Sequence, residues 1–217
     1  MDGPVAVGKS SVGSVLAKRL SYVFFDTGMM YRTFTWKALK SGVSPEDEDM
    51  LCRLASMTKF NFVTYKEECF FVLIDGEDVS HELLSPEIEK WVSIVSKTAG
   101  VRHVMVGEQR KLAQRGKVIM AGRDIGTVVL PWARLKIFLT ASTEERARRR
   151  CKELLERGRN VSYEVVFADL KKRDETDIHR AISPLKPAGD AMVIDTELLN
   201  LEQVVDKICA LVVELNG

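Results

Sequence analysis

The sequence predicts an α/β protein with a parallel central sheet and a small antiparallel β insertion. Three observations support this prediction. A glycine-rich turn at residues 3–10 leads directly into a helical pattern, and short apolar strands then alternate with helices along the chain. Residues 58–99 interrupt this alternation with short aromatic and β-branched runs. The length of 217 residues fits one such domain with an insertion.

The opening stretch Gly3-Pro4-Val5-Ala6-Val7-Gly8-Lys9-Ser10 fits the phosphate-binding pattern G-x-x-x-x-G-K-[ST] at every fixed position. Glycines let successive N–H groups face inward as an anion nest, and the helix that follows adds the positive end of its dipole. The Lys9 ammonium would reach the β- and γ-phosphates, and the Ser10 hydroxyl could bind Mg²⁺. An ordinary helix-capping loop is the alternative. The apolar helical face and the apolar strand that follow favour nucleotide binding.

The start of the chain departs from this pattern. A phosphate loop normally follows a buried strand, but only Met1 and Asp2 precede Gly3. We therefore expect the first central strand to be largely missing from this chain. A start assigned a few residues too late would explain this, with Met1 as the last apolar residue of the strand.

Charge and composition narrow the function. The 32 basic and 31 acidic residues give a formal net charge of +1, which argues against general binding to nucleic acid or a membrane surface. No apolar run approaches the roughly 20 residues that span a bilayer, and no leader opens the chain. The four cysteines form no C-x-x-C pair and no metal spacing, which predicts reduced thiols. We expect a cytoplasmic monomer.

The next strand, residues 22–25, ends in Asp26-Thr27-Gly28 and leads into a helix that stops near Gly42. Polar groups at this point lie at the carboxyl edge of the sheet, where open α/β sheets bind ligands. We expect Arg32 in the first helical turn, where a cation opposes the helix dipole and indicates an anionic partner. A surface arginine is the alternative. Ser44-Pro45-Glu46-Asp47 then predicts an N-cap and a first-turn proline for a helix ending near residue 57.

The insertion begins with two expected strands, Phe60–Tyr65 and Cys69–Ile74, joined by Lys66-Glu67-Glu68. Asp75-Gly76 is a strong hairpin signal, and residues 77–79 could form a third strand. These features predict a small antiparallel sheet rather than a crossover helix.

Two further helices are expected, one opened by Ser85-Pro86-Glu87 and one over residues 101–115. They carry Ser93, Arg102 and Arg110, any of which could simply be solvated, and we favour that interpretation for Arg110.

The strand at residues 117–121 ends in Gly122-Arg123-Asp124-Ile125-Gly126-Thr127, a tight turn that holds charge at the sheet edge. A structural salt bridge would explain Arg123 beside Asp124, but a functional role is favoured at a ligand-binding edge. A strand at 135–139 follows, and Ser142 with Glu145 predicts a capping box.

Basic residues crowd the next two helices, at 146–159 and 171–180, with Gly158 as a break between them. A charge run is usually a solvated face, yet two helices joined in this way could form a hinged, arginine-bearing flap. Phosphoryl transfer needs such a part, because charge builds on the migrating group and water must be excluded. A last strand at 192–194 and a helix capped by Asn200 complete the chain.

The sequence lacks the signature motifs of other classes of nucleotide-binding protein. The chain has no Asp-x-x-Gly switch, no Asn-Lys-x-Asp guanine motif and no acidic strand end typical of motor ATPases. A small phosphate-loop kinase remains. If its acceptor is a phosphate, that group is already a nucleophile at neutral pH and needs positioning rather than a base. The poor placement of His81, His103 and His179 as bases agrees with this.

Six motifs now point to one family. They are Asp2-Gly3-Pro4, Asp26-Thr27-Gly28-x-Met30-Tyr31-Arg32, Gly76-Glu77-Asp78-Val79-Ser80, Gly122-Arg123-Asp124-Ile125-Gly126-Thr127-Val128-Val129, Lys136-Ile137-Phe138-Leu139 and Lys172-Arg173-Asp174-x-x-Asp177-x-x-Arg180. In these motifs, over almost its whole length, the chain resembles the bacterial cytidylate kinases of the nucleoside monophosphate kinase group. It departs at Ala121, where the family usually has an acid, and at Met29, where a small residue is usual.

The resemblance implies a three-layer phosphate-loop kinase fold with a helical lid at about 146–180. It implies transfer of phosphate from ATP, with Mg²⁺, to CMP or dCMP as the small-molecule substrate. ATP would be held by Gly3, Pro4, Val5, Ala6, Val7, Gly8, Lys9, Ser10 and Ser11, with Ser10 on the metal. CMP would be held by Thr27, Arg32, Ser93, Arg102, Arg123, Asp124, Asp177 and Arg180. The catalytic residues would be Lys9, Arg123, Arg157 and Arg173, with Arg148 as a further lid arginine.

Within the CMP set, the resemblance implies separate roles. The phosphate would be held by Arg32, Arg123 and Arg180, and the sugar by Asp177. The cytosine would be read by Thr27, Ser93, Arg102 and Asp124. Residues 1–57 and 100–217 would form the kinase core, and residues 58–99 the nucleoside-monophosphate-binding insertion.

Two other functions remain open at this point. The chain could be a truncated phosphate-loop protein that binds nucleotide with little turnover. It could also be a related small kinase with a different acceptor, because the phosphate loop alone would fit one.

Overall fold

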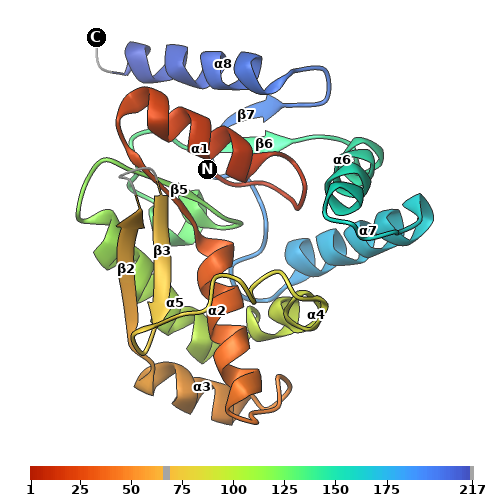
Figure 1. Ribbon diagram of the computed structural model, residues 1–217. Coiled ribbons are helices and arrows are strands. Elements are labelled where there is room, and N and C mark those ends of the chain that lie inside the picture. Colours follow the sequence, from red (N-terminus) through yellow and green to blue (C-terminus); the bar gives the residue numbers. More distant parts are fainter. Residues whose placement is uncertain (66–68, 216–217) are drawn as a thin grey trace. The chain divides into compact units, whose positions relative to one another are not determined.

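The computed structural model describes residues 1–65 and 69–215 (Figure 1). The chain divides into two compact units, and each is described by itself. Unit 1 consists of Met1–Leu16 and Gly122–Gly217, and unit 2 of Ala17–Ala121. No helix in the described part of the chain is long and apolar enough to cross a membrane. The boundaries of these units differ from the expected division into kinase core and insertion, and that division stays a prediction.

Unit 2 contains a sheet whose strands lie in the order β2-β3-β1-β5, with β4 paired to β3. Its strands are β1 (Val23–Asp26), β2 (Phe60–Tyr65), β3 (Cys69–Ile74), β4 (Glu77–Asp78) and β5 (Val118–Ala121). Strand β1 runs parallel to β5 from Val23↔Val118 to Asp26↔Ala121 and parallel to β3 through Phe24↔Cys69. The carboxyl ends of β1 and β5 therefore meet at one edge, as predicted.

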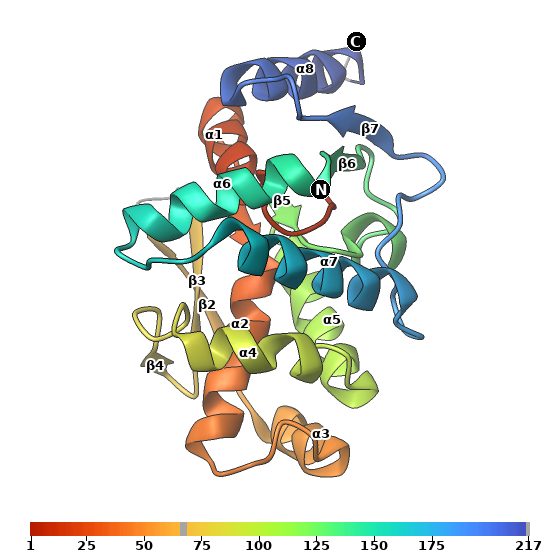
Figure 2. The ribbon, with the colours of Figure 1, turned by 90° about the vertical axis from the view of Figure 1, so that its right-hand side faces the viewer.

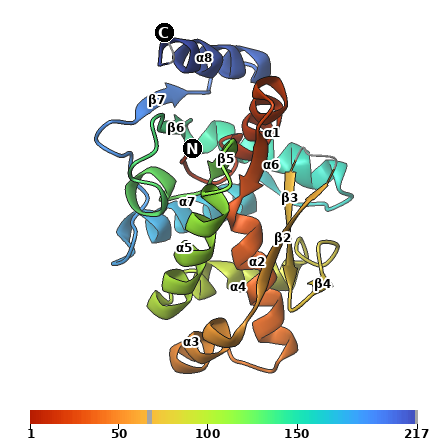
Figure 3. The same ribbon diagram turned by 90° about the vertical axis from the view of Figure 1, so that its left-hand side faces the viewer.

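Strands β2, β3 and β4 pair antiparallel, which confirms the predicted small antiparallel sheet. Figure 3 shows β2 and β3 side by side. Asp75 and Gly76 have positive φ angles, 51° and 89°, as a two-residue hairpin turn requires. Because β3 also pairs with β1, the insertion continues the parallel sheet. The expected connection Lys66-Glu67-Glu68 lies outside the described residues.

The helices of unit 2 begin where side chains cap them. They are α2 (Thr27–Lys40), α3 (Glu48–Met57), α4 (Pro86–Val95) and α5 (Ala99–Ala113). The Asp26 carboxylate accepts from the Gly28 N–H at the start of α2, and Ser85 caps α4 with Pro86 in its first turn.

Two predictions about these helices are wrong. Helix α2 begins at Thr27, directly after β1, so Arg32 lies in its second turn and opposes the helix dipole less than expected. Helix α3 is capped by Asp47 and not by Ser44, because the Asp47 carboxylate accepts from the Met50 N–H. Pro45 therefore precedes the helix.

Aromatic rings pack against β1 in unit 2. Phe25 of β1 lies edge-on to Phe62 of β2 and Phe70 of β3, with ring centroids 5.3 and 6.3 Å apart. Such edge-to-face pairs add about 1 kcal/mol to the burial of apolar area. This packing fixes β1, and with it the residues that follow at its carboxyl end.

In unit 1, β6 (Ile137–Thr140) pairs with β7 (Met192–Asp195) in parallel. No named strand lies in residues 1–8, in line with the expected loss of most of the first strand. Asp2 alone forms isolated bridges, one to Gly122 and one to Phe138. Its N–H donates to Ile137 O and its C=O accepts from Leu139 N, both at 2.8 Å.

The helices of unit 1 include the expected lid pair. They are α6 (Thr143–Glu156), α7 (Tyr163–His179), α8 (Leu201–Glu214) and a π-helical turn η1 (Ile125–Val129), while α1 (Lys9–Leu20) continues from unit 1 into unit 2. Figure 2 shows α6 and α7 side by side. They enclose a small apolar cluster of Ala147, Leu154, Val166 and Leu170. Gly158, at φ 73°, lies in the turn between them, as predicted.

The predicted capping box at α6 is half formed. The Ser142 hydroxyl accepts from the Glu145 N–H at 3.2 Å, but the Glu145 carboxylate pairs with Arg148 and Arg149. The Ser142 N–H donates to Glu197 instead, at 3.0 Å. The N-terminus of α6 is therefore tied to the residues that follow β7.

Candidate active site

The phosphate loop of unit 1 turns through the left-handed region of backbone conformation. Ala6 and Gly8 have φ angles of 59° and 96°, in the left-handed region. A Cβ on Gly3 would lie 2.3 Å from the Leu139 carbonyl oxygen, so a larger residue would separate the loop from β6. The loop ends in α1, whose first N–H groups face an incoming anion at the positive end of the helix dipole.

Lys9, the first residue of α1, is buried against its own loop. Its ammonium donates to the carbonyl oxygens of Gly3 and Pro4, at 2.8 and 2.6 Å. A phosphate oxygen would be a charged acceptor in place of neutral carbonyls and would form the stronger bond. Ser10 is exposed in the same helical turn. The loop thus presents a cation and a hydroxyl together at a helix N-terminus.

The turn at residues 122–127, which follows β5 in the sequence, brings Arg123 and Asp124 together with Asp177 and Arg180. The Arg123 guanidinium donates to the Asp177 carboxylate of α7 at 2.8 Å, across 54 positions of sequence. Burial raises the pKa of Asp177, but the charge and hydrogen bond of Arg123 and the charges of Arg173 and Arg180 outweigh it and leave the pKa below its ordinary value. Asp177 therefore stays ionised and orients the arginines around it.

A second ion pair lies in the same cluster. The Arg180 guanidinium is 3.7 Å from the Asp124 carboxylate, and both side chains are almost fully buried. Arg180 also donates to the Ser183 carbonyl. The Asp124 carbonyl accepts from Val128 and Val129, which closes the π-helical turn. We name Arg123, Asp124, Asp177 and Arg180 the acceptor cluster of unit 1. The cluster thus brings two arginines and two carboxylates together within unit 1.

The lid helices are joined to the phosphate loop by Arg146, whose side chain is 4% exposed. Its guanidinium makes a bidentate pair with Asp174 of α7, at 2.6 and 3.2 Å, and donates to the Val5 carbonyl at 3.2 Å. Removing one partner of such a buried pair costs about 3–5 kcal/mol. Arg146 therefore fixes α6, α7 and the loop as one assembly within unit 1.

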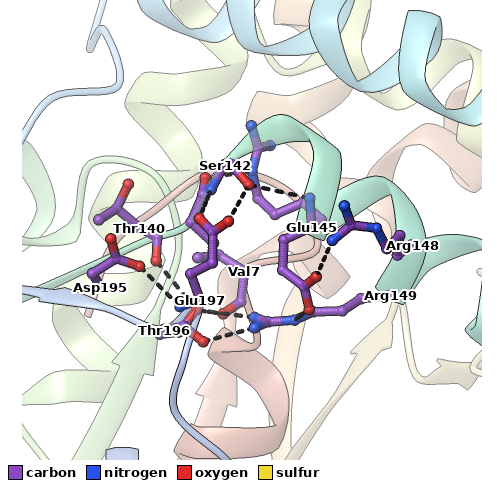
Figure 4. A network of polar contacts seen from close by, with 11 residues as sticks. Val7, Thr140, Ser142, Glu145, Arg148, Arg149, Asp195, Thr196 and Glu197 are labelled. Carbon is purple, nitrogen blue, oxygen red and sulfur yellow. Dashed lines mark hydrogen bonds and ion pairs between the residues drawn. The ribbon is translucent and has the colours of Figure 1, made fainter.

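A second network joins the loop to the residues after β7 (Figure 4). Arg149 of α6 donates to the Thr196 hydroxyl at 2.9 Å and to its carbonyl at 2.7 Å, and pairs with Glu145 at 3.0 Å. The Thr196 hydroxyl lies 3.4 Å from the Val7 carbonyl and 3.2 Å from that of Thr140. Figure 4 shows these groups pointing toward one another from the start of α6 and from the ends of β6 and β7.

The predicted lid arginines fall into two groups. Arg148 and Arg157 lie on the surface and pair with acids of their own helix, Glu145 at 2.8 Å and Glu153 at 2.7 Å. Such exposed pairs contribute at most about 1 kcal/mol. Arg173 of α7 belongs with the acceptor cluster, because its charge acts on Asp177. The catalytic role of Arg157 stays a prediction.

Unit 2 holds the other predicted residues. The Thr27 hydroxyl donates to the Ala121 carbonyl at 2.9 Å, where β1 and β5 end. Arg32 donates to the Leu83 carbonyl and Arg102 to the Ser96 carbonyl, each at 3.0 Å. The Ser96 hydroxyl in turn donates to the Ser93 carbonyl at 3.1 Å. Ser93 and Arg102 are thus linked through Ser96, and their roles toward a ligand stay predictions.

Sequence reasoning assigned no role to three residues that the structure makes prominent. Asp2 contacts the turn at 125–126, Arg146 joins the lid to the loop, and Tyr31 lies under the Arg102 guanidinium at 5.5 Å. Asp2 and Tyr31 do stand inside the quoted motifs, which is the signal that could have found them. Arg146 is one of many arginines in its segment, and only its burial separates it from the others.

A model of the family described as cytidylate kinase matches residues 1–214. The chain belongs to this family. Curated relatives agree: cytidylate kinases of Bacillus licheniformis and Desulforamulus reducens are 45% and 46% identical, over 98% and 96% of this chain and 94% and 93% of theirs. That of a Geobacillus species is 46% identical over 100% of this chain and 96% of its own.

A solved structure with a similar fold comes from Eubacterium ventriosum, an uncharacterised protein with a TM-score of 0.50 at 11% identity, covering 98% of this chain and 96% of that one. At that identity the likeness shows the fold alone. The family match makes the chain a phosphotransferase with the α/β phosphate-loop kinase fold that the sequence predicts.

Proposed function

We propose that this protein transfers the γ-phosphoryl group of ATP to CMP and dCMP, giving ADP with CDP or dCDP. The observation that carries the proposal is the acceptor cluster, in which buried arginines and carboxylates of one family motif set lie within ion-pair distance. The family match over residues 1–214 supports the choice of acceptor. It disfavours a binding-only protein and a kinase with another acceptor.

On the donor side, residues Gly3–Ser11 would hold ATP. The loop N–H groups and the start of α1 would bind the phosphates, and Lys9 would leave the carbonyls of Gly3 and Pro4 for the β- and γ-phosphate oxygens. Ser10 suits Mg²⁺, because its hydroxyl is exposed in the turn that presents Lys9, and Mg²⁺ commonly takes one or two protein oxygens and the substrate phosphates. When bound, the metal would neutralise phosphate charge.

The acceptor cluster would bind CMP in unit 1. Arg123 and Arg180 would hold its phosphate, which attacks without help from a base because it is already anionic. Asp177 would keep Arg123 oriented and contact the sugar. Asp124 would accept a hydrogen bond from the exocyclic amine of cytosine.

In unit 2, Arg32 would also hold the CMP phosphate. Thr27, Ser93 and Arg102 would read the base, because cytosine offers acceptors at N3 and O2 that suit a guanidinium and a hydroxyl. The Tyr31 ring and the Ser96 carbonyl orient Arg102 for this.

The lid residues Arg157 and Arg173 would neutralise charge on the transferring group, with Arg148 as a further cation of the same helices. Such arginines can raise the rate of phosphoryl transfer by about 10³–10⁵. We also propose that the enzyme is a cytoplasmic monomer of pyrimidine nucleotide metabolism, with no nucleic-acid or membrane partner.

Coupled measurement of ADP production over CMP, dCMP, UMP, AMP and shikimate tests the proposal. We expect CMP and dCMP to be the preferred acceptors. Preference for AMP or shikimate would overturn the acceptor assignment. If no acceptor supports ADP production while ATP still binds, a binding-only protein would be favoured.

A further inference from the structure

Asp2 connects the start of the phosphate loop with the turn that carries Arg123 and Asp124. Its side chain is almost fully buried, and its two carboxylate oxygens accept from two successive backbone groups, Ile125 N and Gly126 N, both at 2.7 Å. These partners are 123 and 124 positions away in the sequence. They are the first two residues of η1.

This contact replaces a local cap. Asp124 stands at the N-cap position of η1, where an aspartate normally accepts from the first N–H groups of its own helix. Its side chain makes no such bond. Asp2 satisfies those N–H groups instead, and the Asp124 carboxylate lies toward Arg180 at 3.7 Å.

The fit between Asp2 and the turn is tight. A Cβ on Gly126 would lie 3.3 Å from the Asp2 carboxylate and 3.2 Å from the Lys136 side chain. The carboxylate therefore contacts the backbone directly. Replacing one of its acceptor oxygens would therefore remove a hydrogen bond at residues 125–126.

The backbone of Asp2 serves a different part of unit 1. Its N–H and C=O pair with Ile137 and Leu139 of β6, the strand against which Gly3 packs. The side chain thus acts on the turn of the acceptor cluster, while the main chain anchors the phosphate loop. Substituting the side chain leaves the main-chain pairing available.

We propose that Asp2 is a positioning residue for base recognition: it caps η1 from a distance, so the Asp124 carboxylate is not needed as the cap and stays directed toward Arg180 and the substrate. This inference rests on the proposed role of Asp124 toward the cytosine amine. Without the Asp2 carboxylate, the N–H groups of Ile125 and Gly126 would lack an acceptor, and the Asp124 side chain would turn back to cap its own helix. Recognition of cytosine would weaken, while ATP binding would stay.

The test is the isosteric change Asp2→Asn, with steady-state kinetics for both substrates in the full chain. Asparagine keeps the volume but presents an N–H group to a donor in place of one oxygen. We expect KM for CMP to rise about tenfold or more, the preference for CMP over UMP to fall by a similar factor, and KM for ATP to stay within about twofold, since a factor of ten corresponds to one hydrogen bond lost from a buried site.

Two variants serve as controls. Asp47→Asn changes a carboxylate that caps α3 by accepting from Met50 N, and we expect it to leave both KM values and base preference unchanged. Asp124→Asn removes the proposed base contact directly, so it should reproduce the lost CMP preference and add little when combined with Asp2→Asn.

The outcomes are distinguishable. A uniform fall in kcat with unchanged KM values and unchanged base preference would make Asp2 merely structural and overturn the inference. An equal rise of both KM values would assign the side chain to the phosphate loop and also overturn it. If the unmodified protein does not phosphorylate CMP, the proposed function fails independently of the Asp2 variants.

Discussion

Arg123 in unit 1 is held by a different kind of acceptor from Arg32 and Arg102 in unit 2. In unit 1, Arg123 donates to the ionised Asp177 carboxylate at 2.8 Å. In unit 2, Arg32 and Arg102 donate to the main-chain carbonyls of Leu83 and Ser96 at 3.0 Å. A carboxylate holds a guanidinium more strongly but titrates, whereas a carbonyl holds it at every pH. The orientation of Arg123 should therefore depend on a buried charge, and that of Arg32 and Arg102 on the fold of the backbone.

The largest effect should come from the carboxylate-held arginine. Arg123→Met removes a cation placed at the acceptor phosphate, where charge must be balanced as the phosphoryl group moves. We expect kcat/KM for CMP to fall by about 10³ or more, mostly in kcat. Steady-state kinetics check this, and a loss below tenfold would remove Arg123 from the transition state.

Arg102, which donates to a main-chain carbonyl, should contribute to the binding of CMP more than to the rate of transfer. Arg102→Met removes the proposed cytosine contact, so KM for CMP should rise by about 10–100-fold with a smaller change in kcat. The preference for CMP over UMP should fall with it. A fall in kcat alone, as in the Arg123 variant, would show that the two arginines do not differ in role.

The ion pair predicts a pH dependence that the carbonyl contacts lack. The pKa of Asp177 lies below its ordinary value of 3.8 in the folded protein, because the charges of Arg123 and its neighbours outweigh burial. The pair therefore stabilises the protein above about pH 3.8, and this contribution is lost as the pH falls through the lower, folded pKa.

Asp177→Asn tests this sign. Above pH 5 we expect it to lower the free energy of unfolding by about 2 kcal/mol or more, since a buried pair loses one partner. The difference from the unmodified protein should shrink below pH 3.8. Urea unfolding from pH 7 to pH 3 measures it, with Arg102→Met as the comparison whose difference should not vary with pH. A pH-independent difference for Asp177→Asn would contradict the account.

The smallest effect is expected for a helix cap in unit 2, whose loss should lower stability without changing substrate binding. Ser85→Ala removes the side-chain cap of α4, the helix that carries Ser93, and should cost about 1 kcal/mol. KM for CMP should not change, because the helix keeps its packing through buried Ile88, Val92 and Val95. Thermal unfolding and kinetics on one preparation check both parts.

Short sequence patterns predicted the features that depend on neighbouring residues, such as turns and helix caps. The Asp75-Gly76 hairpin and the Ser85 cap follow from short patterns, and the structure confirms both. The tight turn predicted after β5 is instead continued by the π-helical turn η1 from Ile125. The caps at Ser44 and Glu145 failed because several polar side chains near a helix start compete for the same N–H groups.

Distant pairings could not be predicted in this way. Asp2 meets Ile125 and Gly126, and Arg146 meets Val5, across more than 120 positions. Nothing in the local pattern of an arginine-rich helix shows which arginine is buried. The motifs named the residues of the acceptor cluster, but only the fold shows that Asp177 orients Arg123.

The proposed transfer can be measured directly by following the phosphoryl group. The purified protein is incubated with ATP labelled in the γ-phosphate, Mg²⁺ and CMP, and the products are separated. We expect label in CDP at the rate at which ADP forms, and loss of that label with Arg123→Met. Label released only as inorganic phosphate, or CDP formation unaffected by Arg123→Met, would contradict it.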